Sequence, residues 1–211
     1  MTNSFIKDRP HTKGHVLGCY DGQPVEPTVV TPSLHLLWAD ISLSPVVERD
    51  FAVIFRLKEG IEHLRKSSPY DYVLIDCLPS FGHLQLAALQ ASDYVLIPVR
   101  PSPYALAGMK ELFKTIEKVR KYFNPDLKVL GIVVNQVDGR GIIIEREMET
   151  ALRKTYGPLV LKNRIHKRVG LEESPSFHKG IVQYEPKSAA AKDFLSVAWE
   201  IKKRINQNET K

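Results

Sequence analysis

The sequence is poor in cysteine and contains no long hydrophobic run. Its 211 residues include only Cys19 and Cys77. Two cysteines so far apart make no disulfide framework, so a reducing cytoplasm is the expected compartment. No apolar stretch approaches the roughly 18 residues that a membrane-spanning helix needs, and residues 1–9 contain no apolar signal core. These features are not those of a secreted disulfide scaffold or of an integral membrane protein.

The net charge is unevenly distributed along the chain. Hydrophobic residues make up 43% and charged residues 26%, which is typical of a globular domain. Residues 161–211 carry 11 Lys/Arg and 6 Asp/Glu, and therefore five of the six net positive charges. A basic region of this kind is compatible with a polyanionic partner such as DNA, and equally with an ordinary solvated surface.

Apolar runs alternate with helical patterns, which predicts βαβ units and a mainly parallel sheet flanked by helices, an α/β fold. Residues 1–33 are expected to form loop or short helix. In residues 188–205 we expect Phe194, Val197, Ala198 and Ile201 to face inward. A single domain is predicted over residues 1–206, followed by a polar tail at 207–211. Strands are expected at 33–40, 72–75, 93–99, 129–135 and 159–165, and helices at 46–66, 84–91, 104–123, 143–156 and 188–205.

The most informative segment is residues 70–82, YDYVLIDCLPSFG. Four apolar residues, 72–75, predict a strand buried on both faces, and Asp76 follows at its carboxyl end. Open α/β sheets bind ligands at this edge, where an aspartate can hold Mg²⁺ directly or through water. A strand-ending aspartate without any ligand is the alternative that the bare pattern leaves open.

The amino-acid sequence of this segment resembles the Walker B and switch II region of the ParA/Soj family. Members of this family are deviant-Walker ATPases that segregate plasmids and chromosomes. The family usually has Pro where Leu78 stands. The resemblance implies a P-loop NTPase-like fold of the ParA/MinD type, with ATP and Mg²⁺ as cofactors. It also implies an ATP-dependent homodimer that binds nucleoid DNA non-specifically and responds to a ParB-like partner in the cytoplasm, without a membrane.

The same resemblance assigns nucleotide-site roles to individual residues. Asp76 matches the catalytic Walker B carboxylate that binds Mg²⁺. Asn135 stands where relatives place an Asn that contacts adenine. Without the family resemblance, we would interpret Asn135 as a turn residue at the end of a strand. Residues 165–176, IHKRVGLEESPS, resemble a family segment that borders the adenine pocket and the DNA surface, with Gly170 in place of an Arg. The other nucleotide-binding candidates are Pro79, Ser80 and Gly82 in the switch loop, together with His166 and Lys167.

Basic residues in the last quarter of the chain form the predicted DNA-binding set. Contacts of this kind go to phosphates, so binding should be non-specific and sensitive to salt. The set comprises Lys162, Arg164, Lys167, Arg168, Lys179 and Lys187.

The sequence contains no Gly-Lys-Ser/Thr, the signature of a phosphate-binding loop. The family resemblance covers almost the whole chain but lacks the first strand, the P-loop, the first helix and the second strand. We therefore expect Met1 to be an internal methionine of a longer protein. The printed chain should be catalytically inactive by itself and prone to association through uncovered sheet edges.

Three alternatives remain open. The first is a non-catalytic pseudo-ATPase that binds DNA or a partner, because the phosphate loop is absent. The second is a MinD-like, membrane-recruited ATPase with an amphipathic C-terminal helix. The third is a metal site made from His11, His15 and Cys19, which fall four residues apart and could share one helical face.

Overall fold

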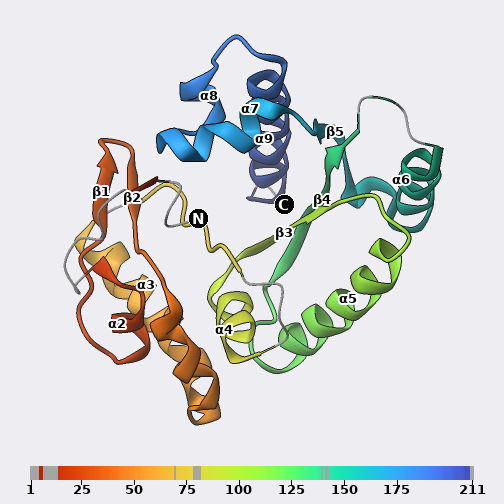
Figure 1. Cartoon of the computed structure of the whole chain (residues 1–211). Coiled ribbons are helices and arrows are strands. Elements are labelled where there is room, and N and C mark those ends of the chain that lie inside the picture. Colours follow the sequence, from red (N-terminus) through yellow and green to blue (C-terminus); the bar gives the residue numbers. More distant parts are fainter. Residues whose placement is uncertain are drawn as a thin grey trace. The chain divides into compact units, whose positions relative to one another are not determined.

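The computed structural model describes residues 5–6, 14–68, 70–77, 82–138, 140 and 143–209. The chain divides into two compact units (Figure 1). The first comprises Met1–Asp93 with Lys118–Leu127, and the second comprises Tyr94–Glu117 with Lys128–Lys211. Within the described ranges, no helix combines the length and the apolar character needed to traverse a bilayer.

The first unit begins with short elements. Helix α2 (Leu17–Tyr20) is followed by an antiparallel pair of strands, β1 (Thr28–Thr31) and β2 (Leu34–Leu36). Strand β2 lies inside the predicted strand at 33–40. Strand β1 was missed because its TVVT sequence lies in a stretch rich in Pro, Gly and Thr.

The helix predicted at 46–66 is built from three pieces. Two 3₁₀ helices, η2 (Ile41–Glu48) and η3 (Phe51–Phe55), precede α3 (Arg56–Ser67). The carboxylates of Asp40 and Asp50 accept hydrogen bonds from backbone N–H groups two residues later, both at 2.9 Å, so each starts a new turn. The prediction of one continuous helix is therefore wrong. Val46, Ile54 and Leu57 join a core with Cys19 and with Ala87 of α4 (His83–Ala91).

Gly60 in α3 has a packing role in this core. A Cβ atom at this position would lie 2.6 Å from the Sγ atom of Cys19, so only glycine permits the approach of α2 to α3. The glycine that weakens the helical pattern in the sequence therefore allows the two helices to pack closely.

The strand predicted at residues 72–75 does not form. The chain from 72 to 77 has neither strand nor bridge, and Tyr72, Val73 and Leu74 are 55%, 49% and 86% exposed. Ile75 is partly buried against the core of the first unit. An apolar run becomes a buried strand only when neighbouring strands pair with its backbone. In the described part of the chain, no segment pairs with these residues.

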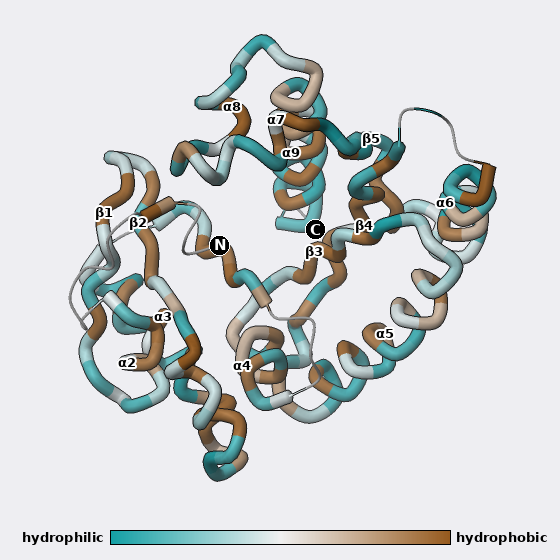
Figure 2. Tube along the Cα trace, in the orientation of Figure 1, coloured by the Kyte–Doolittle hydropathy of each residue, from teal (hydrophilic) through white to brown (hydrophobic). Residues whose placement is uncertain are grey.

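The second unit contains the predicted parallel sheet, in the order β3-β4-β5. Its strands are β3 (Tyr94–Val99), β4 (Lys128–Val137) and β5 (Val160–His166), connected by α5 (Ala105–Tyr122), by α6 (Ile143–Tyr156) and by the 3₁₀ turn η4 (Gly157–Leu159). Brown and teal alternate along α5 and α6 in Figure 2, as expected for helices with one buried face. The strand and helix predictions for this region are confirmed.

After β5 come α7 (Val169–Glu173), the 3₁₀ helix η5 (Ser174–Phe177), α8 (Ile181–Tyr184) and the long helix α9 (Ala189–Glu209). Val197 faces inward as predicted and Ile201 packs beside it, whereas Phe194 is 39% exposed and Ala198 is exposed. Part of the inner face of α9 is instead polar. The pattern of apolar residues therefore placed Phe194 and Ala198 on the buried face of the helix, which is wrong.

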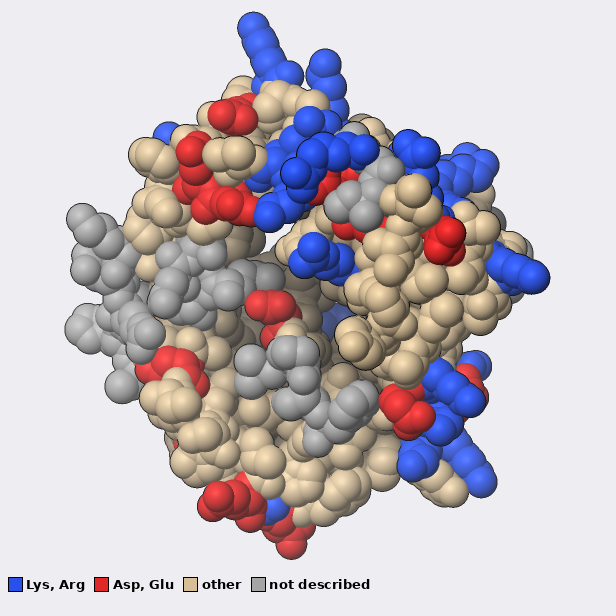
Figure 3. All heavy atoms as spheres, turned by 45° about the vertical axis from the view of Figure 1, so that its right-hand side comes forward, with Lys and Arg blue, Asp and Glu red and all other residues tan. Residues whose placement is uncertain are grey.

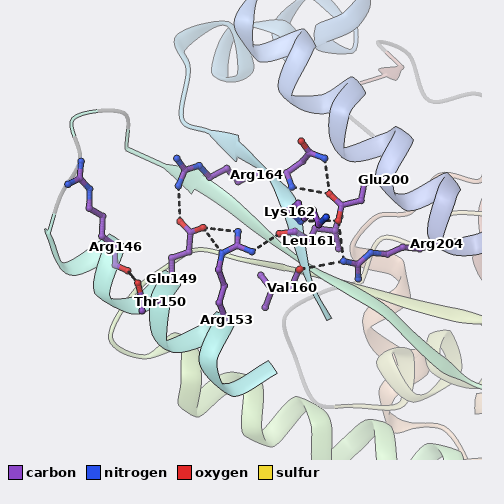
Figure 4. Close-up of polar contacts among 11 residues, drawn as sticks. Arg146, Glu149, Thr150, Arg153, Val160, Leu161, Lys162, Arg164, Glu200 and Arg204 are labelled. Carbon is purple, nitrogen blue, oxygen red and sulfur yellow. Dashed lines mark hydrogen bonds and ion pairs between the residues drawn. The ribbon is translucent and has the colours of Figure 1, made fainter. Parts of the chain in front are cut away.

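Polar side chains of α9 satisfy backbone groups of the sheet (Figure 4). Glu200 accepts hydrogen bonds from the backbone N–H groups of Lys162 and Asn163, both at 2.9 Å. Arg204 donates to the carbonyl oxygens of Leu130 and Leu159, both at 3.1 Å. The helix thereby supplies hydrogen-bond partners to backbone groups of β5, of β4 and of the η4 turn that precedes β5.

Candidate functional site

The predicted nucleotide-site residues are divided between the two units. Asp76 lies in the extended chain of the first unit and is exposed, while Asn135, His166 and Lys167 belong to the second unit. Pro79 and Ser80 lie outside the described residues. The prediction for these positions remains a prediction.

Gly82 occupies the position before α4, with φ −159° and ψ −176°. This is extended backbone that any residue adopts, and a Cβ atom here would be 3.8 Å from the Cγ1 atom of Val47, an ordinary contact. The backbone at Gly82 therefore does not require glycine in this conformation.

Asn135 lies near the carboxyl end of β4, beside a local distortion. Gln136 has φ +57°, which is uncommon for a residue with a side chain, and the pairing of β4 with β5 is irregular between Val134 and Val137. The side-chain oxygen of Asn135 accepts a hydrogen bond from the backbone N–H of Gln136 at 2.9 Å. Both residues belong to β4, so this hydrogen bond lies within the strand, and no pattern in the sequence predicted the left-handed Gln136.

Two polar residues that were not predicted from the sequence, Asp138 and Arg140, lie just beyond the same strand. The Arg140 guanidinium donates to both carboxylate oxygens of Asp138, through Nε at 3.0 Å and Nη2 at 2.6 Å. These hydrogen bonds, together with the one from the backbone N–H of Arg140, lower the pKa of Asp138 to about 2. Asp138 is therefore a fixed negative charge already paired with a cation.

His166 is held by α9. Its backbone N–H and its ring Nδ1 contact the same carboxylate oxygen of Asp193, at 3.2 and 2.8 Å. A proline at this position would have no N–H to donate. Lys167 is exposed and lies 3.5 Å from a carboxylate oxygen of Glu172.

Gly170, in place of the family's second Arg, has its side-chain space taken by Glu185. A Cβ atom would lie 2.8 Å from the Oε2 atom of Glu185. An arginine at this position would require Glu185 to move. The space that an arginine side chain would need is therefore occupied by a negatively charged side chain.

The six predicted DNA-binding residues are all exposed and all belong to the second unit. Lys162 and Arg164 lie on β5, Lys167 and Arg168 follow it, and Lys179 and Lys187 flank α8. Figure 3 shows Lys and Arg side chains gathered toward the top of the view, where the C-terminal helices of the second unit lie, with fewer Asp and Glu among them. Arg164 pairs with Glu149 of α6 at 2.9 Å.

An open hollow of about 310 Å³ lies between α6 and β5, lined by Arg146, Glu149, Thr150, Arg153 and Arg164 (Figure 4). The Oε1 atom of Glu149 accepts hydrogen bonds from Nε and Nη2 of Arg153, at 3.0 and 2.8 Å. Burial raises the pKa of Glu149, but the hydrogen bonds from Arg153 and Arg164 outweigh that effect and lower it overall. Of the arginines that line this hollow, only Arg164 belongs to the predicted DNA-binding set, because nothing in the sequence shows that α6 packs beside β5.

The suggested metal site is not supported where the structure can be examined. His11 lies outside the described residues, and among those described no three His, Cys, Asp or Glu side chains are arranged to hold a metal ion. His15 is 6% exposed, and its Nδ1 accepts from the backbone N–H of Leu17 at 2.9 Å while its Nε2 lies 3.2 Å from Asp40. Because His15 is buried and both of its ring nitrogens make polar contacts, it has a structural role.

A parallel sheet with helical crossovers and polar residues at its strand ends is the architecture of nucleotide-binding α/β proteins. Residues 15–129 match the family described as an AAA domain. The sporulation initiation inhibitor protein Soj of Bacillus subtilis is 37% identical over 176 residues, which cover 82% of this chain and 66% of Soj. The chromosome partitioning protein ParA of Caulobacter vibrioides is 34% identical, with 85% of this chain and 68% of ParA covered. The chain belongs to the ParA/Soj family.

A solved structure supports the same fold. It is cobyrinic acid a,c-diamide synthase from Mycobacterium smegmatis with a bound ATP analogue and magnesium, which is 27% identical and has a TM-score of 0.64. The match covers 83% of this chain and 74% of the synthase. The chain itself spans about two thirds of the length of Soj and ParA.

Proposed function

We propose that the protein acts in chromosome or plasmid partitioning as an ATPase of the ParA/Soj type. The observation that carries this proposal is 34–37% identity, over 82–85% of the chain, to proteins named Soj and ParA. In this role the protein would work in the cytoplasm at the nucleoid, as a homodimer that binds DNA non-specifically and is regulated by a ParB-like partner.

The residues present fit Mg²⁺-ATP in part. Asp76 offers an exposed carboxylate, the ligand type that Mg²⁺ prefers, and the amide of Asn135 suits the edge of a purine. Pro79, Ser80 and Gly82 would contact the γ-phosphate, with His166 and Lys167 bordering the base. Bound Mg²⁺ would neutralise phosphate charge. Because the printed sequence has no Gly-Lys-Ser/Thr, we expect weak nucleotide binding and no hydrolysis by this chain alone.

The second half of the proposal concerns DNA. The exposed basic residues of the second unit supply positive charge without base-reading groups, so they would contact phosphates and hold DNA of any sequence. Arg168 and Lys187 are the clearest members of this set, because both are exposed and both lie in segments that resemble the family.

The nucleotide half is tested by titrating a fluorescent ATP analogue, with and without Mg²⁺, into the wild type, Asp76→Ala and Asp71→Ala. Asp71 is a matched control, since it is an exposed aspartate in the same segment. We expect weak, Mg²⁺-dependent binding in the wild type and the control, and weaker binding in Asp76→Ala. Equal binding by all three proteins would refute the role of Asp76, and no binding by the wild type would refute nucleotide binding by this chain.

A further inference from the structure

The hollow between α6 and β5 brings together arginines that are distant in the sequence. Arg146, Glu149 and Arg153 recur at three- and four-residue spacing on α6 and so share one face of the helix. Arg164 comes from β5 and reaches the same face through its ion pair with Glu149. Two guanidinium groups therefore bind one carboxylate, and the third arginine, Arg146, also lines the hollow, so its lining carries two net positive charges.

Glu149 fixes the geometry of two of these arginines. One carboxylate oxygen accepts two hydrogen bonds from Arg153, and the other accepts one from Arg164 at 2.9 Å. Arg153 is restrained further, because its Nη1 donates to the carbonyl oxygen of Leu161 at 3.1 Å. The Glu149 side chain is only 13% exposed, so the carboxylate lies beneath the guanidinium groups.

The arginines keep an accessible side. The side chains of Arg153 and Arg164 are 37% and 44% exposed, and Arg146 is exposed one helical turn away. Figure 4 shows Arg146 extending from the start of α6, away from the Glu149 cluster. An anion entering the hollow would meet oriented N–H donors whose positions the carboxylate already fixes, so it would lose little affinity to side-chain ordering.

We propose that this α6–β5 hollow binds a backbone phosphate of DNA and extends the DNA-binding surface from β5 onto α6. The inference rests on the proposed function and adds Arg146 and Arg153 to the residues that touch DNA. A nucleic-acid backbone fits better than a small free anion, because the hollow is open. Lys162 precedes Arg164 by two residues on β5, so a chain of phosphates can continue along this strand.

The test is fluorescence anisotropy of a labelled duplex of mixed sequence, titrated over a series of salt concentrations in the presence of Mg²⁺ and ATP. The variants are Arg146→Ala and Arg153→Ala, with Arg65→Ala as the matched control, since Arg65 is an exposed arginine in the last turn of α3 in the first unit. Within the described residues the Arg146 side chain forms no ion pair, so Arg146→Ala should leave the fold intact. A thermal melt of each variant checks this.

We expect each hollow variant to reduce the magnitude of the negative slope of log K against log salt by about 0.9, the value for one lost B-DNA phosphate contact. The same relation gives a loss of roughly eightfold in affinity at 0.1 M salt. Arg65→Ala should match the wild type. Wild-type binding that Arg146→Ala and Arg153→Ala leave unchanged would overturn this inference alone, whereas no DNA binding by the wild type would overturn the proposed DNA-binding function as well.

Competitors identify the ligand class. Unlabelled single-stranded and duplex DNA should displace the probe, while inorganic phosphate at equal phosphate concentration should not. Polyglutamate represents an acidic protein partner. If polyglutamate binds the wild type as tightly as DNA does, and only its binding depends on Arg146, the hollow is a protein-docking site and the inference is wrong.

Discussion

Glu200 offers the sharpest test of how the second unit is held together. Its carboxylate accepts hydrogen bonds from the backbone N–H groups of Lys162 and Asn163, and a third from the Asn163 side-chain amide at 2.8 Å. It also pairs with Arg204 at 3.1 Å, and its side chain is 14% exposed. Replacing Glu200 with alanine removes every one of these contacts without touching the apolar core.

The expected cost follows from those contacts. A hydrogen bond to a charged group contributes roughly 1.5–3 kcal/mol, and breaking a buried ion pair from one side costs roughly 3–5 kcal/mol. Lys162 is exposed, so water can replace part of the loss at its N–H group. We therefore expect Glu200→Ala to lower the free energy of unfolding by about 3 kcal/mol.

Urea denaturation followed by circular dichroism measures this change. Glu209→Ala is the matched control, because Glu209 is an exposed glutamate on the same helix and should change stability by less than about 0.5 kcal/mol. A loss below about 1 kcal/mol in Glu200→Ala would refute the reasoning that α9 satisfies the edge of β5.

Three further predictions concern packing, pH and reactivity. Gly131→Ala should lower the free energy of unfolding in urea by about 2–3 kcal/mol, because its Cβ would lie 2.3 Å from Leu161 Cδ1 and 3.1 Å from the Leu159 carbonyl oxygen. An unchanged midpoint would contradict the close packing. Burial raises the pKa of Glu200, but the hydrogen bonds of Asn163 and Lys162 outweigh it and lower the pKa overall. The stabilisation is therefore present above the pKa of an unfolded glutamate, about 4.3, and is lost as pH falls through the lower folded pKa. Acid titration of Glu200→Gln should show a smaller loss than the wild type, and equal losses would contradict this. Burial raises the pKa of both thiols, that of Cys19 to about 11, but only Cys77 is exposed. A thiol reagent should therefore modify Cys77 first and Cys19 only on unfolding, and equal rates of modification would contradict this.

The sequence predicted the second unit well because its signals are local and mutually consistent. The helix expected at 143–156 is found at Ile143–Tyr156, and the apolar runs near 93–99, 129–135 and 159–165 are all parallel strands. Each run has a neighbour to pair with, and each connecting helix has a regular apolar face, so pattern and packing agree.

The failures arise where the outcome depends on partners that a pattern does not reveal. Residues 72–75 have the composition of a central strand, but no described segment pairs with them. On α9, polar Glu200 and Arg204 face inward because they bind the sheet's backbone, and Phe194 turns outward. Hydropathy periodicity assigns apolar residues to the buried face of a helix. It cannot predict that a charged side chain is buried because it forms hydrogen bonds with the backbone of a strand.

The candidate sites show the same limit. The sequence identified Arg164 as a basic residue, but its neighbours Arg146 and Arg153 lie on a different element and became part of a site only when α6 was placed beside β5. Asp138 and Arg140 were likewise missed, because a short loop gives no periodic signal.

The most direct test of the proposed function is DNA binding by the wild type and by the double variant Arg168→Ala/Lys187→Ala. Two labelled duplexes of equal length and unrelated sequence would be titrated across a range of salt concentrations. The account predicts equal affinity for the two duplexes, a steep fall of affinity with salt, and weaker binding with a shallower salt dependence in the double variant. A strong preference for one duplex, or a double variant that binds like the wild type, would contradict it.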